Sequence, residues 1–368
     1  STSTMVFSGN IQGNDMLLSN IKLYLQEDVE AIGLFKTLQT ADSINLENSV
    51  RNLNLEIISG WASKADAIGV MAGKSIGFNL YNITVDSSDV TLVGGNAVGG
   101  IVGYVGGEFD IDGISTNIGV NSTRQLSSYR YSIYEGVNNK NTESNLTDVF
   151  YAGSAFGIVD GYNRGEYDIN DVNGRSLDGK FYYVNHVNVS GAPVLIGDTV
   201  GGAFGFVGER VYIKNVNIVI KDAEFKGYQY SAGAVGENRG VIENVNVEIE
   251  GESFNDTNYA AAGVVGLNIG GLIRNVFAKV DIVRNANVSV GGIVARNING
   301  TIKNKNLYAL AYKFDTYCYE RINLMREYYD EYNKNLLQQI SHSDSSVEKS
   351  KLMPVIYRIM LTREQIIS

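Results

Sequence analysis

The chain has almost no cysteine or proline. Its 368 residues include one cysteine, Cys318, and two prolines. A single cysteine excludes an intramolecular disulfide and a zinc site built from cysteine ligands. Collagen-like chains and disordered linkers combine abundant glycine with abundant proline, so the 41 glycines found here need another explanation. A chain of strands and tight turns fits this balance, because glycine supplies positive φ in turns.

Histidine and long apolar runs are also scarce. The two histidines, His186 and His342, are isolated, and neither lies in the His-Glu-x-x-His motif of a zinc peptidase. The same isolation argues against a catalytic triad built on histidine. No run of 18 apolar residues occurs, so the sequence predicts no transmembrane helix.

Positive charge is in the minority, with 30 Lys and Arg residues against 40 Asp and Glu residues and a net charge of −10. Phosphate binding needs clustered basic residues, so we expect no nucleic acid as a partner. The acidic surface is typical of a soluble protein. Residues 1–4 contain neither an initiator Met nor a signal peptide, and we therefore expect a piece of a larger protein.

What the sequence does contain is a short Gly-x-x-Gly unit that recurs within apolar sequence. Complete and degenerate copies begin at Gly69, Gly100, Ser154, Gly202, Gly233, Gly263 and Gly292. From Gly202 the next copies follow after 31, 30 and 29 residues, and Gly69 and Gly100 are also 31 residues apart. Self-similarity at a fixed period indicates a repeat architecture.

Each glycine unit is followed by a second block that ends in alternating apolar residues. In one copy these are Val245, Val247 and Ile249, the period of two that is typical of a half-buried strand. An asparagine falls at the same phase of four copies. Because asparagine tolerates left-handed φ, we expect it to form a corner and to stack into a ladder, at Asn215, Asn244, Asn275 and Asn304.

These repeats predict an all-β fold, a right-handed parallel β-helix with about 30 residues per repeat. One such unit cannot bury its apolar face alone, whereas stacked units bury a continuous core. The even spacing disfavours a β-sandwich. The segments between the glycine units show no helical period, which disfavours a leucine-rich horseshoe.

The segments at 200–206 and 290–295 resemble GLUG repeats, in which a Gly-Gly-hydrophobic-hydrophobic-Gly turn precedes an Ile-x-Asn and an alternating strand. The resemblance covers about residues 5–304. It implies the repeat architecture, and GLUG arrays occur in bacterial surface adhesins and in the N-terminal part of immunoglobulin A1-cleaving metallopeptidases. The sequence departs from the pattern at Ala72 and Ala295, which replace the last glycine.

The β-helix is expected to span residues 1–304, with an inserted region around 108–197. Insertions in solenoids project from one face and often bind partners. Tyrosine gives a rigid apolar plane with a polar tip, so tyrosines in this region are candidate contacts for a host protein or a glycan. The alternative is a surface loop without a partner. The candidate residues are Tyr129, Tyr131 and Tyr134.

The same region carries acidic clusters. Asp110 and Asp112 alternate in an expected strand and therefore share a face. A second cluster partly resembles a calcium loop, although Arg175 stands where a third ligand is expected and no Glu closes the loop. A solvated turn is the favoured interpretation, calcium is the alternative, and no other cofactor is expected. The candidate calcium ligands are Asp168, Asn170, Asp171, Asn173 and Asp178.

From residue 305 the sequence becomes rich in tyrosine and charge. Apolar residues in steps of three and four predict an amphipathic helix over residues 307–340, and a second helix follows the turn at 341–346. We expect residues 305–368 to cap the open end of the β-helix or to act as a linker.

Taken together, the sequence predicts a secreted or cell-surface scaffold that acts as an adhesin or as a protein- or glycan-binding module, without enzymatic activity. A carbohydrate-active lyase or hydrolase is one alternative, since β-helices carry such activity on clustered carboxylates. A filament that self-associates through the solenoid ends is the other alternative.

Overall fold

The protein was analysed as a computed structural model that divides into two units, Ser1–Lys313 and Phe314–Ser368. The second unit, with Cys318 and His342, lies outside the residues that the structure describes. The described residues contain strands and no helix. They are 6–24, 29–40, 48–62, 65–87, 89–122, 149–161, 181–191, 193–251, 254, 259–281, 289–303 and 308–312.

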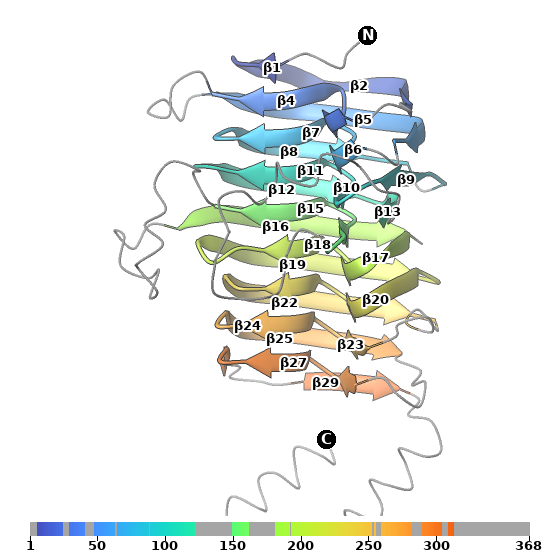
Figure 1. Ribbon diagram of the computed structural model, residues 1–368, viewed down its shortest axis with the longest axis vertical. Coiled ribbons are helices and arrows are strands. Elements are labelled where there is room, and N and C mark those ends of the chain that lie inside the picture. Colours follow the sequence, from blue (N-terminus) through green and yellow to red (C-terminus); the bar gives the residue numbers. More distant parts are fainter. Residues whose placement is uncertain are drawn as a thin grey trace, which may run out of the picture. The chain divides into compact units, whose positions relative to one another are not determined.

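The first unit is built from parallel strands stacked in two sheets (Figure 1). The smaller sheet has nine strands, and each after the first follows a glycine turn or its counterpart. These strands are β1 (Val6–Phe7), β4 (Phe35–Gln39), β7 (Ala72–Ile76), β11 (Val102–Gly106), β15 (Phe156–Asp160), β18 (Phe204–Val207), β21 (Val235–Asn238), β24 (Val265–Ile269) and β27 (Val294–Ile298).

The larger sheet has twenty strands of two kinds. The alternating blocks of the repeat form β2 (Ile11–Tyr24), β5 (Ser49–Trp61), β8 (Asn79–Val85), β12 (Asp110–Thr116), β16 (Tyr182–Gly191), β19 (Val211–Lys221), β22 (Val241–Glu250), β25 (Leu272–Asp281), β28 (Thr301–Lys303) and β29 (Tyr308–Tyr312). The strands that lead to the glycine turns are β3 (Val29–Ile32), β6 (Ala65–Ile68), β9 (Thr91–Gly94), β10 (Ala97–Gly99), β13 (Gly119–Ser122), β14 (Tyr151–Gly153), β17 (Val194–Gly201), β20 (Glu224–Ala232), β23 (Ala260–Ala262) and β26 (Ser289–Gly291).

Equivalent positions of successive repeats pair directly. Val235 pairs with Val265 and Val265 with Val294, so each repeat forms one rung of the stack. Parallel pairing between residues one repeat apart, continued along the chain, is the arrangement of a β-helix or solenoid. The prediction of an all-β fold with stacked parallel strands is confirmed.

The repeat glycines are required because the rungs approach closely. A Cβ atom on Gly202 would lie 1.9 Å from the carbonyl oxygen of Gly233, and one on Gly233 would lie 2.2 Å from that of Gly263. Neither Gly202 nor Gly233 has a positive φ. The sequence argument from positive φ therefore does not apply to these glycines, and steric exclusion of a side chain explains them.

The main core is one continuous apolar column inside the stack, and two smaller apolar clusters accompany it. Alternate residues of each long strand point inward, as in β22, where Ile242, Val245 and Val247 are buried. Aromatic side chains stack between rungs, with ring centroids 5.7 Å apart for Phe156 and Phe204. Each large apolar side chain buried in this way contributes roughly 1.5–3 kcal/mol to stability.

The predicted asparagine corner is present. Asn215, Asn244 and Asn275 have φ of 55°, 54° and 51° within their strands. Asn244 donates its Nδ2 hydrogen to Oδ1 of Asn215 at 3.1 Å, which extends the corner as a ladder between two rungs. Asn304 lies outside the described residues. His186 occupies the same register position in β16, with φ of 49°.

A second asparagine ladder, which the sequence did not predict, lies in the nine-stranded sheet. Asn238 and Asn268 have no exposed surface. Asn238 Nδ2 donates to Asn268 Oδ1 at 2.8 Å, and Asn268 Nδ2 donates to Asn297 Oδ1 at 2.7 Å. Asn238 Oδ1 also accepts the backbone N–H of Gly240 at 3.1 Å. The ladder satisfies buried polar groups where the chain turns between sheets.

Two sequence expectations change. The helix predicted from residue 307 is wrong for 308–312, which form β29 and pair in parallel with the second half of β25. Hydrogen bonds to an otherwise open strand edge outweigh the apolar period of three to four residues there. In addition, much of the expected insertion at 108–197 belongs to the stack, because five strands, β12 to β16, lie within it and β17 begins in it.

Candidate functional site

None of the binding or metal residues proposed from the sequence is in the described part of the chain. Tyr129, Tyr131 and Tyr134 lie between residues 123 and 148, and the candidate calcium ligands lie between residues 162 and 180. Those ligands are Asp168, Asn170, Asp171, Asn173 and Asp178. In the described residues, no group of three or more His, Cys, Asp or Glu side chains is placed to hold a metal ion.

A different feature stands out on the outside of the long strands. The residue just before the corner points outward and pairs in register with its counterpart in the next rung; the corner is Gly113 in β12 and His186 in β16 instead of asparagine. We call this set the outer row: Arg51, Tyr81, Asp112, Asn185, Lys214, Glu243, Arg274 and Lys303. Every member is polar, charged or aromatic, and a buried core residue precedes it in every strand except β28, where Ile302 is exposed.

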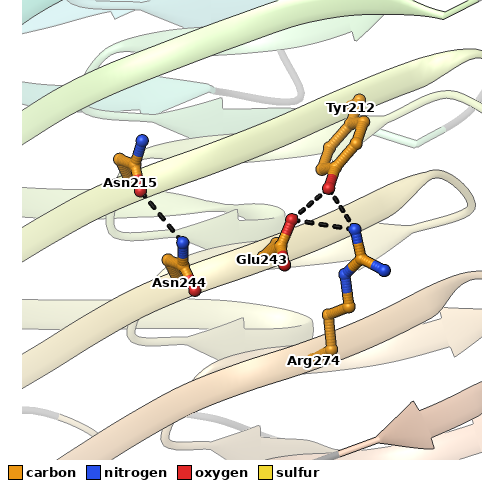
Figure 2. Close-up of polar contacts among 5 residues, drawn as sticks. All are labelled: Tyr212, Asn215, Glu243, Asn244 and Arg274. Atoms are coloured by element: carbon orange, nitrogen blue, oxygen red, sulfur yellow. Dashed lines mark hydrogen bonds and ion pairs between the residues drawn. The ribbon is translucent and has the colours of Figure 1, made fainter.

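Three side chains from successive strands meet at one point of this face (Figure 2). The Tyr212 hydroxyl donates to the Glu243 carboxylate, and the Arg274 guanidinium donates to the Tyr212 oxygen. Arg274 Nη2 also lies 2.9 Å from Glu243 Oε2. Burial and the hydrogen bond to Glu243 raise the pKa of Tyr212, and the same hydrogen bond, with Arg274, lowers the pKa of Glu243. The three groups are thus held in a fixed arrangement.

Tyr212 forms an aromatic group with Phe181 and Tyr183. Tyr183 and Tyr212 each lie two residues before the outer-row residue of their strand. Tyr183, in β16, is the register partner of Tyr212, and the ring centroids are 5.4 Å apart. Phe181 packs edge-on against Tyr212 at 6.0 Å, and Lys214 lies 5.6 Å from the centre of the Tyr183 ring. Tyr183 remains 40% exposed and Phe181 remains 37% exposed. Exposed aromatic side chains beside cations are a frequent basis of recognition.

The acidic pair that the sequence singled out lies on the same face. Asp110 is the register partner of Tyr183, and its Oδ2 accepts a hydrogen bond from the Tyr81 hydroxyl at 3.0 Å. The Arg51 guanidinium stacks 4.3 Å from the centre of the Tyr81 ring. Burial, followed by the charge of Asp110 and this hydrogen bond, raises the pKa of Tyr81 to about 12.

The second acid of that pair contacts the histidine at the corner. Asp112 Oδ1 lies 2.7 Å from His186 Nδ1, and His186 Nδ1 lies 2.8 Å from Asn185 Nδ2. The prediction that Asp110 and Asp112 share a face is confirmed, because the buried Ile111 separates two outward side chains. Both acids therefore belong to the polar surface that includes the outer row.

A separate polar cluster joins the nine-stranded sheet to β14 of the larger sheet. The buried Tyr151 hydroxyl donates to Glu237 Oε2 at 3.0 Å, and Arg239 Nη2 is 2.8 Å from Glu237 Oε1. Burial raises the pKa of Asp160 to about 6; Arg239 opposes this rise and Glu209 adds to it. Both oxygens of Glu237 have partners, so this cluster fits a structural role.

The sequence contained a signal for the outer row that the glycine repeat obscured. Within each alternating block, the position before the asparagine is charged at Lys214, Glu243 and Arg274. Aligning the blocks on the asparagine would have placed these residues side by side. The contacts of Glu243 and Arg274 with Tyr212 require the rung register and could not be read from spacing alone.

No protein-family model matches this chain, and comparisons with curated proteins and with solved structures likewise find no match. Among the described residues, no helix is long and apolar enough to span a membrane.

Proposed function

We propose that this chain is a secreted or cell-surface β-helix scaffold, an adhesin or a protein- or glycan-binding module that forms part of a larger protein. One observation carries the proposal: the outer row and the adjacent aromatic group place polar, charged and aromatic side chains outward in successive rungs. A stack with a continuous core holds these side chains at a regular spacing, which favours recognition of an extended partner.

The finer assignment of the fold belongs to the same proposal. The spacing of the glycine units and the asparagine corner support a GLUG-type repeat, and parallel crossover connections strongly favour a right-handed coil. The helical segment is proposed for the remainder of the C-terminal region, after β29. Circular dichroism of the full chain compared with a chain ending at Lys313 would test it, and equal helical signal would contradict it.

Binding by the aromatic group tests the main proposal. The full chain would be screened against a panel of host-surface glycans and extracellular proteins. The double variant Tyr183→Ala and Tyr212→Ala should weaken binding about tenfold, since buried contacts of aromatic side chains dominate interfaces. A matched control is Asn217→Ala with Asn246→Ala, a hydrogen-bonded pair beyond the corner on β19, the strand of Tyr212, and on the next strand β22. Equal binding by both double variants would contradict the proposal.

A second candidate function is a carbohydrate-active enzyme, which the contact between Asp112 and His186 at 2.7 Å favours. A carboxylate that orients an imidazole is a general-base arrangement. Turnover of an acidic-sugar panel would be measured for the chain and for Asp110→Ala and Asp112→Ala. Turnover that both variants abolish, with folding intact, would support the enzyme and contradict the scaffold.

A further inference from the structure

The end of the outer row carries an excess of positive charge. Lys214, Glu243, Arg274 and Lys303 are Cα partners in the successive strands β19, β22, β25 and β28. Neighbouring strands lie roughly 4.8 Å apart, so the three cations fall within about 15 Å. Among these four positions one carboxylate, Glu243, offsets them. This local charge is opposite in sign to the net charge of −10 of the chain.

The guanidinium of Arg274 keeps unused donors. Its Nη2 makes both hydrogen bonds, to Tyr212 and to Glu243. The Nε–H is buried without a hydrogen-bond partner among the described residues, so a ligand on the surface cannot reach it. Nη1 makes no hydrogen bond with the described residues. A guanidinium that is fixed through Nη2 and keeps Nη1 as a donor is suited to an anionic group.

The two lysines of the row are not neutralised by ion pairs with described residues. Lys214 lies over the Tyr183 ring, and Lys303, one rung beyond Arg274, is exposed. The Glu243 carboxylate is already paired with Arg274 and with the Tyr212 hydroxyl, and no ion pair joins it to either of these described lysines. The row therefore presents cations at intervals, with tyrosine hydroxyls beside them.

We propose that this part of the outer row, from Lys214 to Lys303, binds the acid groups of an extended acidic polysaccharide. The inference rests on the proposed binding function and names its ligand class. Cations spaced along a straight row suit a chain that carries carboxylates at intervals, and the hydroxyl of Tyr183 suits the sugar hydroxyls between them. The net charge of −10 disfavours a nucleic acid, whose charge is far denser.

The experiment uses the full chain and polygalacturonate, with its methyl-esterified form as a matched ligand without charge. We expect binding to the free acid at low salt, weaker binding as salt rises, and little binding to the ester. Arg274→Gln should weaken binding about tenfold, because it removes charge-assisted hydrogen bonds. Lys214→Gln and Lys303→Gln should each weaken it about threefold, as expected for exposed charges.

Two further variants separate recognition from structural damage. Lys279 lies on β25, the strand of Arg274, but beyond the bend at Asn275. Lys279→Gln should therefore leave binding unchanged. Glu243→Gln removes the only carboxylate among these four positions and should strengthen binding about threefold. A misfolded variant would not produce that gain.

Three outcomes would overturn the inference. They are equal binding of acid and ester, equal losses of binding for Lys279→Gln and Lys303→Gln, or displacement of bound polygalacturonate by a single-stranded oligonucleotide as effectively as by free polygalacturonate. If a neutral panel ligand binds and the Tyr183→Ala and Tyr212→Ala variant loses it while the charge variants do not, only the ligand class is wrong. If no ligand of the panel binds and polygalacturonate does not bind either, the proposed function itself fails.

Discussion

Asn244 donates its side-chain amide to Oδ1 of Asn215 at 3.1 Å, and both residues have left-handed backbone angles, with φ of 54° and 55°. The same side chain type thus does two things at this corner. It tolerates a φ that most residues avoid, and it joins one rung to the next. The corner bends each long strand just after its outer-row residue. It therefore borders the outer row on one side.

Two substitutions of Asn244 should separate the contribution of the backbone angle to stability from that of the side chain. Asn244→Ala should lower the free energy of unfolding by about 2 kcal/mol, because alanine is strained at positive φ and lacks the amide. Asn244→Gly should cost about 1 kcal/mol, since glycine accepts this φ. Urea unfolding of both variants checks the prediction. A larger loss for glycine than for alanine would show that the backbone angle is not limiting.

The buried ladder predicts a larger loss. Asn268→Ala removes the acceptor of Asn238 and the donor to Asn297. Because Asn238 is fully buried, its amide then lacks this acceptor where water cannot replace it, and we expect a loss of about 3 kcal/mol in the free energy of unfolding. Asn246→Ala breaks a comparable pair with Asn217 in a more exposed position, and it should cost about 0.5 kcal/mol. Equal effects in thermal unfolding would contradict the assigned burial.

Close stacking of glycines predicts a position-specific intolerance of alanine. A Cβ atom on Gly233 would lie 2.2 Å from the carbonyl oxygen of Gly263, so Gly233→Ala should prevent folding or cost more than about 3 kcal/mol. Gly270 has φ of 67° with no atom within 4 Å of an added Cβ, and Gly270→Ala should cost about 1 kcal/mol. The soluble yield and the thermal unfolding temperature of the two variants would rank their stability. A Gly233→Ala protein as stable as the parent would contradict the steric explanation.

Asp160 predicts a pH dependence of stability. Its pKa in the folded protein is raised from 3.8 to about 6, chiefly by burial. Between about pH 4 and pH 6 the folded state therefore holds a proton that the unfolded state releases, and stability falls as pH rises through this window. Asp160→Asn should be more stable than the parent at pH 7, by at most roughly 3 kcal/mol.

That difference between Asp160→Asn and the parent should disappear near pH 4. Urea unfolding at several pH values would measure it, and Asp89→Asn, at an exposed aspartate, serves as the control. A constant difference between pH 4 and pH 7 would show that Asp160 does not titrate in this window.

The local features of this protein were accessible from its sequence. The glycine spacing indicated the rung, the alternation in residues 245–249 indicated the inward face, and the phase of Asn215 and Asn244 indicated the corner. Each of these depends on neighbours within a few residues, or on a pattern that the repeat copies. For the same reason the strand at Tyr308–Tyr312 was missed, because only the open edge of β25 makes it a strand.

The candidate site was decided by the tertiary structure. Residues about 30 positions apart become neighbours only when the rungs are in register, which brings Arg274 to both Glu243 and Tyr212. Tyr151 and Glu237 meet across 86 positions of sequence, a distance that no local pattern encodes. The sequence by itself determined the repeat and its corner, since these follow from local backbone preferences. The stacking of rungs decided which outward side chains share a surface, because hydrogen-bonded register sets the distances between them.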